Sequence, residues 1–292
     1  MPFIEYSSSR VGVNAFRVGA RVTGRSIVAL CLAAATALSQ TTPAAASKDS
    51  VKPLFAFHDL IVAGVFTGAT IAAFPLDKRL AHHLENPGAQ ANKLFNHAAN
   101  GLEVFTSPGA YLIGGGLYAI GRVGGYGRVA DLGLHGTEAV LAGDVVTGLL
   151  KGLVGRSRPF VTADSNPHDF AFGHGFTNGD RQSFPSGHTT TAFAAAAAVT
   201  AETGRWWPRS TWVVGPLMYT GASLVGLSRM YHNKHWASDV ALGAAIGTFA
   251  GQKVVQFNHS HPNNALDRAL LHMSLAPDGR GGTAVGYSMT IP

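Results

Sequence analysis

The sequence contains little cysteine and little charge, and each shortage excludes a class of chemistry. Cys31 is the single cysteine among 292 residues, and it lies in an N-terminal segment that we expect to be removed. The mature chain would then have no thiol, which excludes disulfides, thiolate metal sites and catalysis by cysteine. Charged residues make up 13% of the chain, against about 25% in ordinary soluble domains. The sequence shows no basic stripe with interleaved aromatic residues, so we expect no nucleic-acid partner.

The first 46 residues have the pattern of a signal peptide. Four arginines precede an apolar run at 27–38, and alanines at 44–46 offer a small-residue cleavage site. The run is short for a bilayer-spanning helix of roughly 20 residues, so we favour a cleaved signal and an exported protein of the periplasm or cell envelope. A membrane anchor that is never cut is the alternative. Removal of residues 1–46 lowers the net charge from +6 to +3.

The remainder is predicted to be an all-α helical bundle of about six core helices. Glycine is abundant, at 36 residues, and small residues with little charge are typical of closely packed helices. Apolar stretches with helical spacing lie at about 58–75, 109–121, 129–151, 187–203, 211–227 and 235–255. We assign 47–257 to this helical domain.

The tail, residues 258–292, differs in character. Alternating apolar residues at 283–291 follow a Gly-rich turn at 277–282, which predicts a short β-hairpin. A frayed terminus is the alternative.

The composition does not decide whether the bundle crosses a membrane. The stretches at 58–75 and 109–121 are short for a span, and 129–151 carries four acidic or histidine side chains, a heavy polar load for hydrocarbon. With an exported N-terminus, three crossings would also place Lys151 inside the cell. The basic, aromatic turn at 205–209, in contrast, resembles a membrane edge. We favour a bundle that does not span but can contact a membrane surface, with an integral membrane protein as the alternative.

Three short clusters carry the chemistry. They are Lys151 with Arg158-Pro159, then Pro185-Ser186-Gly187-His188, then Ser228-Arg229 with His235 and Asp239. Together they supply three fixed cations, two histidines and one carboxylate. Such a set can bind a tetrahedral oxyanion and attack it with an imidazole. We expect the helices to bring the clusters together as an anion site at one end of the bundle.

The spacing Lys-x6-Arg-Pro, Pro-Ser-Gly-His and Ser-Arg-x5-His-x3-Asp resembles the type 2 phosphatidic acid phosphatase family. That superfamily also contains bacterial non-specific acid phosphatases and vanadium haloperoxidases. Every signature position is present in order across residues 151–239. The resemblance implies a helical fold and catalysis without a metal or other cofactor. Vanadate would be a cofactor only in a haloperoxidase.

His235 is the predicted nucleophile, and Asp239 is its predicted orienting partner. The two residues are four apart, so they share one face of a helix. Asp239 would accept the proton of one ring nitrogen and leave the other free to attack phosphorus, which implies a phosphohistidine intermediate. His188 is predicted to protonate the departing alkoxide as general acid. A lone His-x3-Asp pair is more often a surface contact, and the full set of clusters favours catalysis.

Five further residues are predicted to bind the phosphoryl group: Lys151, Arg158, Ser186, Gly187 and Arg229. The three cations would face its negative oxygens. Ser186 is expected to cap the helix that follows, so that its hydroxyl and the Gly187 N–H meet the anion. Ser228 is expected to position Arg229. Arg156 lies between two signature residues and matches neither, so we assign it no role.

The loop between the first two clusters contains His168, Asp169, His174 and Asp180. These side chains can be read as metal ligands, but their spacing matches no standard site. We therefore expect a loop that shapes the substrate pocket and no metal site.

These observations favour a phosphatase that hydrolyses phosphate monoesters or diphosphates. Its partner would be a phosphorylated small molecule or a lipid phosphate, such as phosphatidate or an isoprenyl diphosphate. A vanadium haloperoxidase, using the same anion pocket, is the alternative, although the chain length and the tight Ser-Arg-x5-His spacing favour hydrolysis. A non-catalytic anion-binding protein is a third reading, and the intact signature argues against it. The sequence fixes neither the natural substrate nor the oligomeric state.

Overall fold

The structure is a computed structural model that describes residues 53–104, 106–261 and 264, together with two strands in the tail. The predicted signal peptide, 1–46, lies outside the described residues. Six long helices form the bundle: α2 (Phe57–Ala73), α6 (Gly109–Val123), α7 (Gly127–Val154), α8 (Gly187–Trp206), α9 (Thr211–Tyr231) and α10 (Ala237–Ser260). Each corresponds to one of the six predicted apolar stretches, so the all-α fold class is confirmed.

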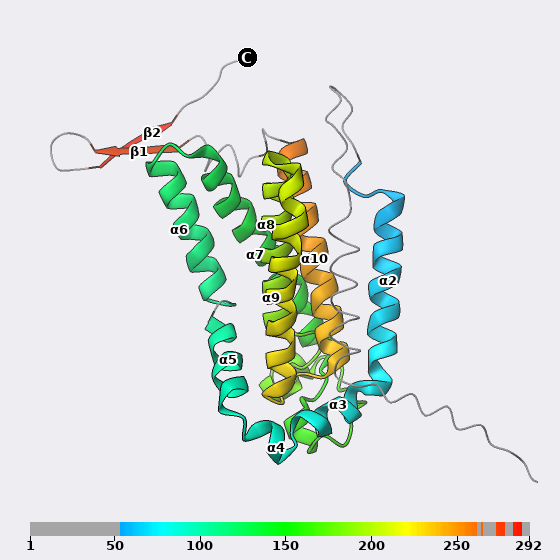
Figure 1. Cartoon of the computed structure of the whole chain (residues 1–292). Coiled ribbons are helices and arrows are strands. Elements are labelled where there is room, and N and C mark those ends of the chain that lie inside the picture. Colours follow the sequence, from blue (N-terminus) through cyan, green and yellow to red (C-terminus); the bar gives the residue numbers. More distant parts are fainter. Residues whose placement is uncertain (1–52, 105, 262–263, 265–272, 278–282, 288–292) are drawn as a thin grey trace, which may run out of the picture.

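Consecutive long helices run in opposite directions, so their connections gather at two ends. In Figure 1, α2, α7 and α9 descend, whereas α6, α8 and α10 rise. Helix α8 packs against α7, α9 and α10, while α2 packs against α10 and α6 against α7. The largest core cluster joins α2, α8, α9 and α10 and includes Phe66, Phe193, Tyr219, Ala222 and Ala245.

The segment between α2 and α6 folds into short helices that the apolar spacing does not predict. They are α3 (Asp77–Leu84), α4 (Pro87–Gln90) and α5 (Lys93–Val104). Helix α3 is mostly polar, with the sequence DKRLAHHL, so a search for apolar stretches passes over it. Both α3 and α5 pack against α9, and with the loop that follows α7 they cover the lower end of the bundle in Figure 1.

Glycines allow α10 to approach α8 closely. Gly243, Gly247 and Gly251 are four residues apart and therefore share one face of α10. A Cβ added at any of them would lie within 2.6 Å of an atom of Ser186 or of α8. A larger residue would therefore push the two helices apart.

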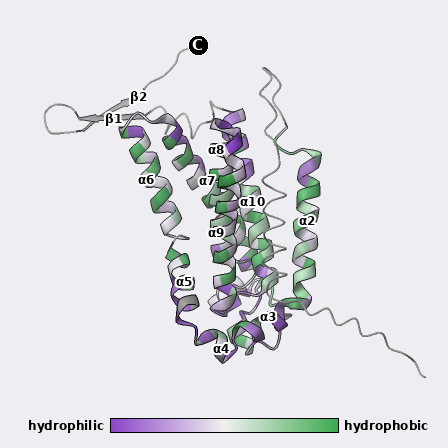
Figure 2. Cartoon of the chain, in the orientation of Figure 1, coloured by the Kyte–Doolittle hydropathy of each residue, from purple (hydrophilic) through white to green (hydrophobic). Residues whose placement is uncertain are grey.

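The histidine and the acidic side chains of α7 are buried or partly buried. His135 is buried, and Asp144 accepts hydrogen bonds from Tyr111 and Thr191, each at 2.8 Å. Large apolar side chains instead lie exposed on the outer faces of α2, α6, α7 and α9, among them Leu60, Ile61, Leu112, Ile120, Val145, Leu149, Val213 and Leu217. Figure 2 shows hydrophobic colour along these helices and hydrophilic colour toward both ends. The polar load of α7 therefore does not oppose contact between the bundle and lipid.

Two strands in the tail, β1 (Met273–Pro277) and β2 (Thr283–Tyr287), pair antiparallel. Met273 lies opposite Tyr287 and Pro277 opposite Thr283. The turn between the strands, 278–282, lies outside the described residues. The pair forms where the sequence predicts a hairpin, and Figure 1 places it at the upper end of the bundle, beside α6.

Replacement of Gly247 by alanine is expected to destabilise the bundle, because the added Cβ would lie 2.3 Å from the carbonyl oxygen of Thr190. Overpacking of this kind costs about 1–3 kcal/mol, so the thermal unfolding midpoint of the purified protein should fall. Gly221→Ala, on α9, is the matched control, since nothing lies within 4 Å of its added Cβ. Equal midpoints for the two variants would show that the α8–α10 contact does not require a glycine.

Candidate active site

The three predicted clusters meet at one end of the bundle. Lys151 and Arg229 lie in the last turns of α7 and α9, Ser186 immediately precedes α8, and Asp239 lies in the first turn of α10. Because these four helices alternate in direction, the two helix ends and the two helix starts lie together at the lower end of the bundle in Figure 1. The antiparallel packing thus assembles residues that are up to 88 positions apart in the chain.

A tight turn after α7 carries Arg158 into the site. Gly155 has a φ of 61°, and a Cβ there would lie 1.9 Å from the carbonyl oxygen of Ala171. Both the backbone conformation and the close approach require glycine. The chain then runs back across the end of the bundle, where the Arg158 backbone N–H donates to the Asp180 carbonyl at 3.0 Å.

The loop that follows α7 also holds two of the cations in place. Lys151 Nζ donates a hydrogen bond to the Gln182 carbonyl at 2.5 Å. Arg158 Nε donates to the Gly179 carbonyl at 3.1 Å. Each side chain keeps further N–H groups, so both can still donate to a ligand.

The positive charges converge on the two predicted catalytic histidines. Lys151 and Arg158 act electrostatically on the His235 ring, and both act with Arg229 on His188. Burial and the neighbouring charge of Arg229 lower the pKa of the Arg158 guanidinium below its usual value. Cations held this close repel one another, so an anion among them would relieve the repulsion.

Ser186 occupies the N-cap position of α8, but its hydroxyl does not cap the helix. This corrects the expected capping bond. The buried Ser186 Oγ instead accepts a hydrogen bond from Thr189 Oγ1 at 2.9 Å. A Cβ added at Gly187 would lie 3.5 Å from Lys151 Cε. The first turn of α8, with its unpaired N–H groups, and the Lys151 side chain therefore line the same space.

A cavity of about 210 Å³ lies beside His188, between α7 and α8. Its lining also includes Ser107, Asp144, Thr147, Gly148, Lys151, Gly187 and Thr191. A second cavity, of about 490 Å³, is lined by Arg229, Glu103, Phe160 and Lys234, among others. The histidine predicted to protonate the leaving group thus borders a space that can hold part of a substrate.

The ring of His235 is held by a backbone carbonyl. His235 Nδ1 lies 2.7 Å from the Ser183 carbonyl oxygen and 3.6 Å from Asp239 Oδ2, and only the first distance is a hydrogen bond. A carbonyl can only accept, so Nδ1 carries the proton and Nε2 has a free electron pair. The predicted tautomer is therefore present, but the expected direct acceptor, Asp239, is not the one used. Asp239 Oδ2 already accepts from Ser183 Oγ at 2.5 Å and from the Trp236 N–H at 2.8 Å.

His235 is buried, with 4% of its surface exposed. Burial lowers the pKa of its imidazole to about 3. The ring is therefore neutral near pH 7, the state in which a ring nitrogen can act as a nucleophile.

Arg156, which the sequence analysis left without a role, is fully buried behind the site. Its guanidinium donates to Asp239 Oδ1 at 2.6 Å, to Asp77 Oδ2 at 2.7 Å and to the Pro167 carbonyl at 2.6 Å. Ser238 completes the network, because its hydroxyl donates to Asp77 Oδ2 at 2.6 Å. Asp239 is thus held by Arg156 on one oxygen and by the Ser183 hydroxyl and the Trp236 N–H on the other.

Four aromatic rings surround the Arg156 guanidinium carbon, with centroids 4.9–5.7 Å away: Phe74, Phe170, Phe184 and Trp236. Cation–π contacts of this kind strengthen when water is excluded. Asp77 lies 79 residues before Arg156 and Asp239 lies 83 residues after it. No local spacing in the sequence signals such a network.

Glu103 is a second site residue that the sequence did not reveal. Its carboxylate pairs with Arg229 and accepts a hydrogen bond from the His232 ring at 2.6 Å. Glu103 lies on α5, a helix that the apolar spacing does not predict, and the residues around it match no motif. The pair fixes the orientation of Arg229. The expected contact from Ser228 is not made, since its hydroxyl donates to the Val225 carbonyl at 2.7 Å.

The polar residues of the loop after α7 serve its folding. Asp169 accepts a hydrogen bond from Ser157 Oγ at 2.6 Å and forms an ion pair with Arg181 at 3.2 Å. The His168 ring stacks on Phe74, one of the rings around the buried guanidinium. These contacts engage Asp169 and His168 in the packing of the loop, and the substrate-shaping role of the loop stays a prediction.

Replacement of Arg156 by methionine is expected to destabilise the protein strongly, because the carboxylates of Asp77 and Asp239 would lose their buried counter-charge. Removal of one partner of a buried ion pair costs about 3–5 kcal/mol. Arg181→Met is the matched control, since that pair with Asp169 is partly exposed and should contribute at most about 1 kcal/mol. The measurement is unfolding by heat or denaturant of the purified proteins. Equal losses in the two variants would contradict a central role for Arg156.

Comparisons with known proteins bear on the segment that contains these residues. Residues 134–261 match the sequence profile of the PAP2 superfamily. A stretch of 72 residues is 51% identical to the lipid A 1-phosphatase of Porphyromonas gingivalis, and it covers 24% of this chain and 15% of that protein. This chain therefore spans only a small part of the length of that relative.

Among solved structures, a transmembrane PAP2-type phosphatidylglycerolphosphate phosphatase from Bacillus subtilis matches with a TM-score of 0.35 and 20% identity. The match covers 65% of this chain and 96% of that one. The profile match includes every residue of the three clusters, from Lys151 to Asp239. Residues 134–261 of this chain thus match the PAP2 superfamily, the family that the motifs predict.

Proposed function

We propose that this protein is a membrane-embedded phosphoric ester hydrolase that removes phosphate from a lipid through a phosphohistidine intermediate. The observation that carries the proposal is the buried, neutral His235 ring, whose Nδ1 proton is held by Ser183 while Lys151 and Arg158 act on it from nearby. The lipid A 1-phosphatase that shares 51% identity over 72 residues supports the same class of reaction. Side chains supply the positive charge, and the reaction uses no metal cofactor.

In the first step, His235 Nε2 attacks phosphorus, and a P–N bond forms as the P–O bond to the leaving group breaks. Nδ1 keeps its proton, which is hydrogen-bonded to the Ser183 carbonyl. The ring therefore gains a delocalised positive charge when the P–N bond forms. Asp239, 3.6 Å from Nδ1, stabilises that charge across a short distance in a buried setting. Arg156 keeps Asp239 ionised and oriented.

The leaving group departs as an alcohol when protonated His188 gives its proton to the ester oxygen. Burial and the nearby Arg229 lower the pKa of this ring to about 4 in the empty site, so the negative charge of the bound phosphate has to offset the neighbouring cations for the ring to take up that proton. In the second step water attacks phosphorus, His188 takes a proton from that water, and the P–N bond breaks to release inorganic phosphate. Lys151, Arg158 and Arg229 face the equatorial oxygens, where negative charge accumulates in the transition state. The first turn of α8 adds backbone N–H groups to the same pocket.

The outer surface of the bundle supports a position in the bilayer. Among the described residues, Phe57–Leu84 is the stretch long and apolar enough to cross a membrane by length and composition, and only 17% of its apolar window is buried within the protein. The outer faces of α6, α7 and α9 also expose large aliphatic side chains. A soluble protein rarely exposes apolar surface so extensively. These observations favour the integral membrane alternative over the non-spanning bundle that the sequence analysis preferred.

The two helix connections opposite the site are basic, which is compatible with a site outside the cytoplasm, although Lys78, Arg79, Lys93 and Lys234 also place positive charge at the site end. Arg122, Arg128, Arg205 and Arg209 lie at or near the two helix connections opposite the site, at the upper end in Figure 1. Cytoplasmic loops carry an excess of such residues. The site would then face the periplasm, and α2 would begin on the cytoplasmic side. A cleaved signal peptide in a spanning bundle would produce the opposite orientation.

Replacement of His235 by alanine is expected to reduce phosphate release from phosphatidate by at least about 10³-fold, because no intermediate can form. The assay uses the full-length protein in detergent micelles with EDTA, and a soluble phosphate monoester serves as a second substrate. His83→Ala, on the exposed face of α3, is the control and should retain activity.

With His188→Ala, alkaline denaturation during turnover of ³²P-labelled substrate should trap labelled phosphohistidine.

The outcomes separate the alternatives. A preference for the soluble ester would contradict the lipid substrate but not the mechanism. Turnover that requires a metal, or that survives His235→Ala, would contradict the mechanism. Peroxide-dependent halogenation after vanadate loading, with no release of phosphate from any ester, would identify a haloperoxidase instead.

The orientation can be tested by cysteine labelling in a Cys31→Ser background. Asn166→Cys lies in the exposed loop at the site end, and Arg209→Cys lies in the exposed turn at the other end. In intact bacterial cells with a permeabilised outer membrane, an impermeant maleimide should label Asn166→Cys and should reach Arg209→Cys only after lysis. Labelling of both positions before lysis would indicate a bundle that does not span, and the reverse pattern would place the site in the cytoplasm.

A further inference from the structure

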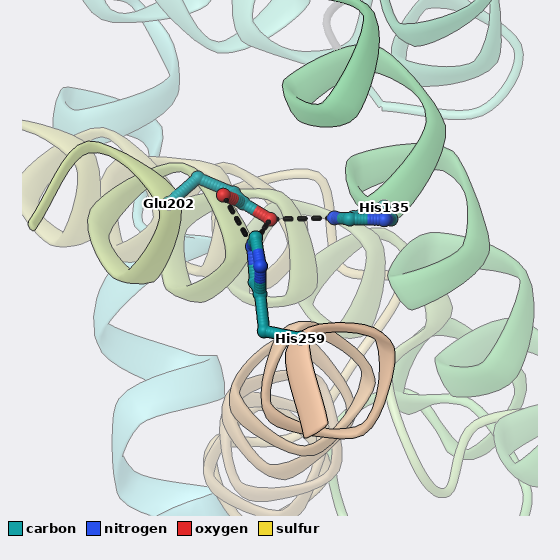
Figure 3. Close-up of side chains that lie close together, drawn as sticks. All are labelled: His135, Glu202 and His259. Carbon is teal, nitrogen blue, oxygen red and sulfur yellow. Dashed lines mark hydrogen bonds and ion pairs between the residues drawn. The ribbon is translucent and has the colours of Figure 1, made fainter. Parts of the chain in front are cut away.

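Three metal-ligating side chains converge at the end of the bundle opposite the catalytic site. They are His135 on α7, Glu202 near the end of α8, and His259 in the last turn of α10. Figure 3 shows the two imidazoles directed at the carboxylate from different helices. His135 Nδ1 lies 2.6 Å from Glu202 Oε1, and His259 Nε2 lies 2.9 Å from both carboxylate oxygens. None of these residues belongs to the signature of the catalytic site.

We propose that His135, Glu202 and His259 bind a divalent transition-metal ion, with Zn²⁺ as the best match. Two imidazole nitrogens and one carboxylate oxygen are a ligand set that Zn²⁺ accepts, with a fourth position for water. The ion would have a structural role, tying α7, α8 and α10 together at the far end from the reaction. The reaction at His235 remains independent of it.

The distances are compatible with such an ion after a small adjustment. One ligand atom from each residue can be chosen so that all three lie within 4.8 Å of one another. Tetrahedral coordination at about 2.0–2.1 Å places ligand atoms about 3.3 Å apart. The carboxylate and the His135 ring would therefore separate by less than about 1 Å to admit the ion, which rotations of the side chains can provide.

Charge also favours a cation at this point. Glu202 is fully buried, with 0% of its surface exposed, and within the described part of the chain its ion-pair partners are the two imidazoles. A buried carboxylate is costly unless a positive charge compensates it. A divalent ion at this point would neutralise the carboxylate and use both rings as ligands.

The site is accessible to an ion from one side. The side chain of His259 is 23% exposed, whereas those of His135 and Glu202 are 3% and 0% exposed. An ion can therefore reach the buried ligands past His259, in the last turn of α10. The ring planes of the two histidines are nearly perpendicular, at 84°, so their nitrogen electron pairs approach the carboxylate from different directions.

The test measures zinc bound to full-length protein without an affinity tag, in detergent, after chelation and dialysis against Zn²⁺. Wild type and His235→Ala should each retain about one zinc ion per chain, and Zn²⁺ should raise their unfolding midpoints. Glu202→Gln and His259→Ala should bind zinc at least about tenfold more weakly and lose that stabilisation. Because His235→Ala has no turnover, the result is independent of the proposed phosphatase activity.

His261→Ala is the matched control, since this histidine lies two residues from His259 and stacks on Phe257 instead. It should bind zinc like wild type. Co²⁺ substitution gives a second readout, because the visible absorption of a site with nitrogen and oxygen ligands should disappear in Glu202→Gln. The proposal is overturned if wild type binds no more zinc than His259→Ala. In that case the three side chains form a hydrogen-bonded network that holds protons rather than a metal.

Discussion

The buried guanidinium of Arg156 is the interaction on which the site end of the bundle depends. It joins Asp77 from α3 to Asp239 from α10, and its rings come from the end of α2, the loop after α7 and the loop before α10. A charge without water around it must be satisfied completely. The segments that carry its partners are therefore confined to one arrangement. That arrangement also holds the Asp239 carboxylate and the Ser183 carbonyl beside His235.

The geometry of the predicted catalytic residues depends on the Arg156 network indirectly. His235 bonds to a backbone carbonyl, so the position of the ring depends on how the loop before α8 is held. Ser183 Oγ bonds to Asp239, and Asp239 bonds to Arg156. The predicted nucleophile, the carbonyl that accepts its hydrogen bond and the carboxylate thus form one connected network. Glu103 has a similar supporting role for Arg229 from α5.

Ionisable side chains gather at the two ends of the bundle, whereas the outer sides of the bundle are aliphatic. The sides expose aliphatic residues, while acidic and histidine side chains of α7 turn inward. One end assembles three cations around a neutral imidazole, a set suited to an anion. The other end assembles two imidazoles around a buried carboxylate, a set suited to a cation. The antiparallel helices allow this separation, because each long helix contributes one terminus to each end.

The amino-acid sequence by itself determined the all-α class, the six long helices within a few residues, and the histidines and cations that the structure brings together at the candidate site. These follow from local signals, namely apolar spacing along a helix and motifs whose members lie within eleven positions of one another. Only the tertiary structure decided the role of Arg156, the link from Glu103 to Arg229, the use of Ser183 rather than Asp239 as acceptor, and the meeting of His135, Glu202 and His259. Each of these depends on residues brought together from dozens of positions apart, and no local spacing encodes such a contact. For the same reason, the sequence alone did not decide whether the bundle crosses a membrane. The sequence shows that α7 contains acidic residues, but only helix packing determines that they face inward and leave the aliphatic face to the outside.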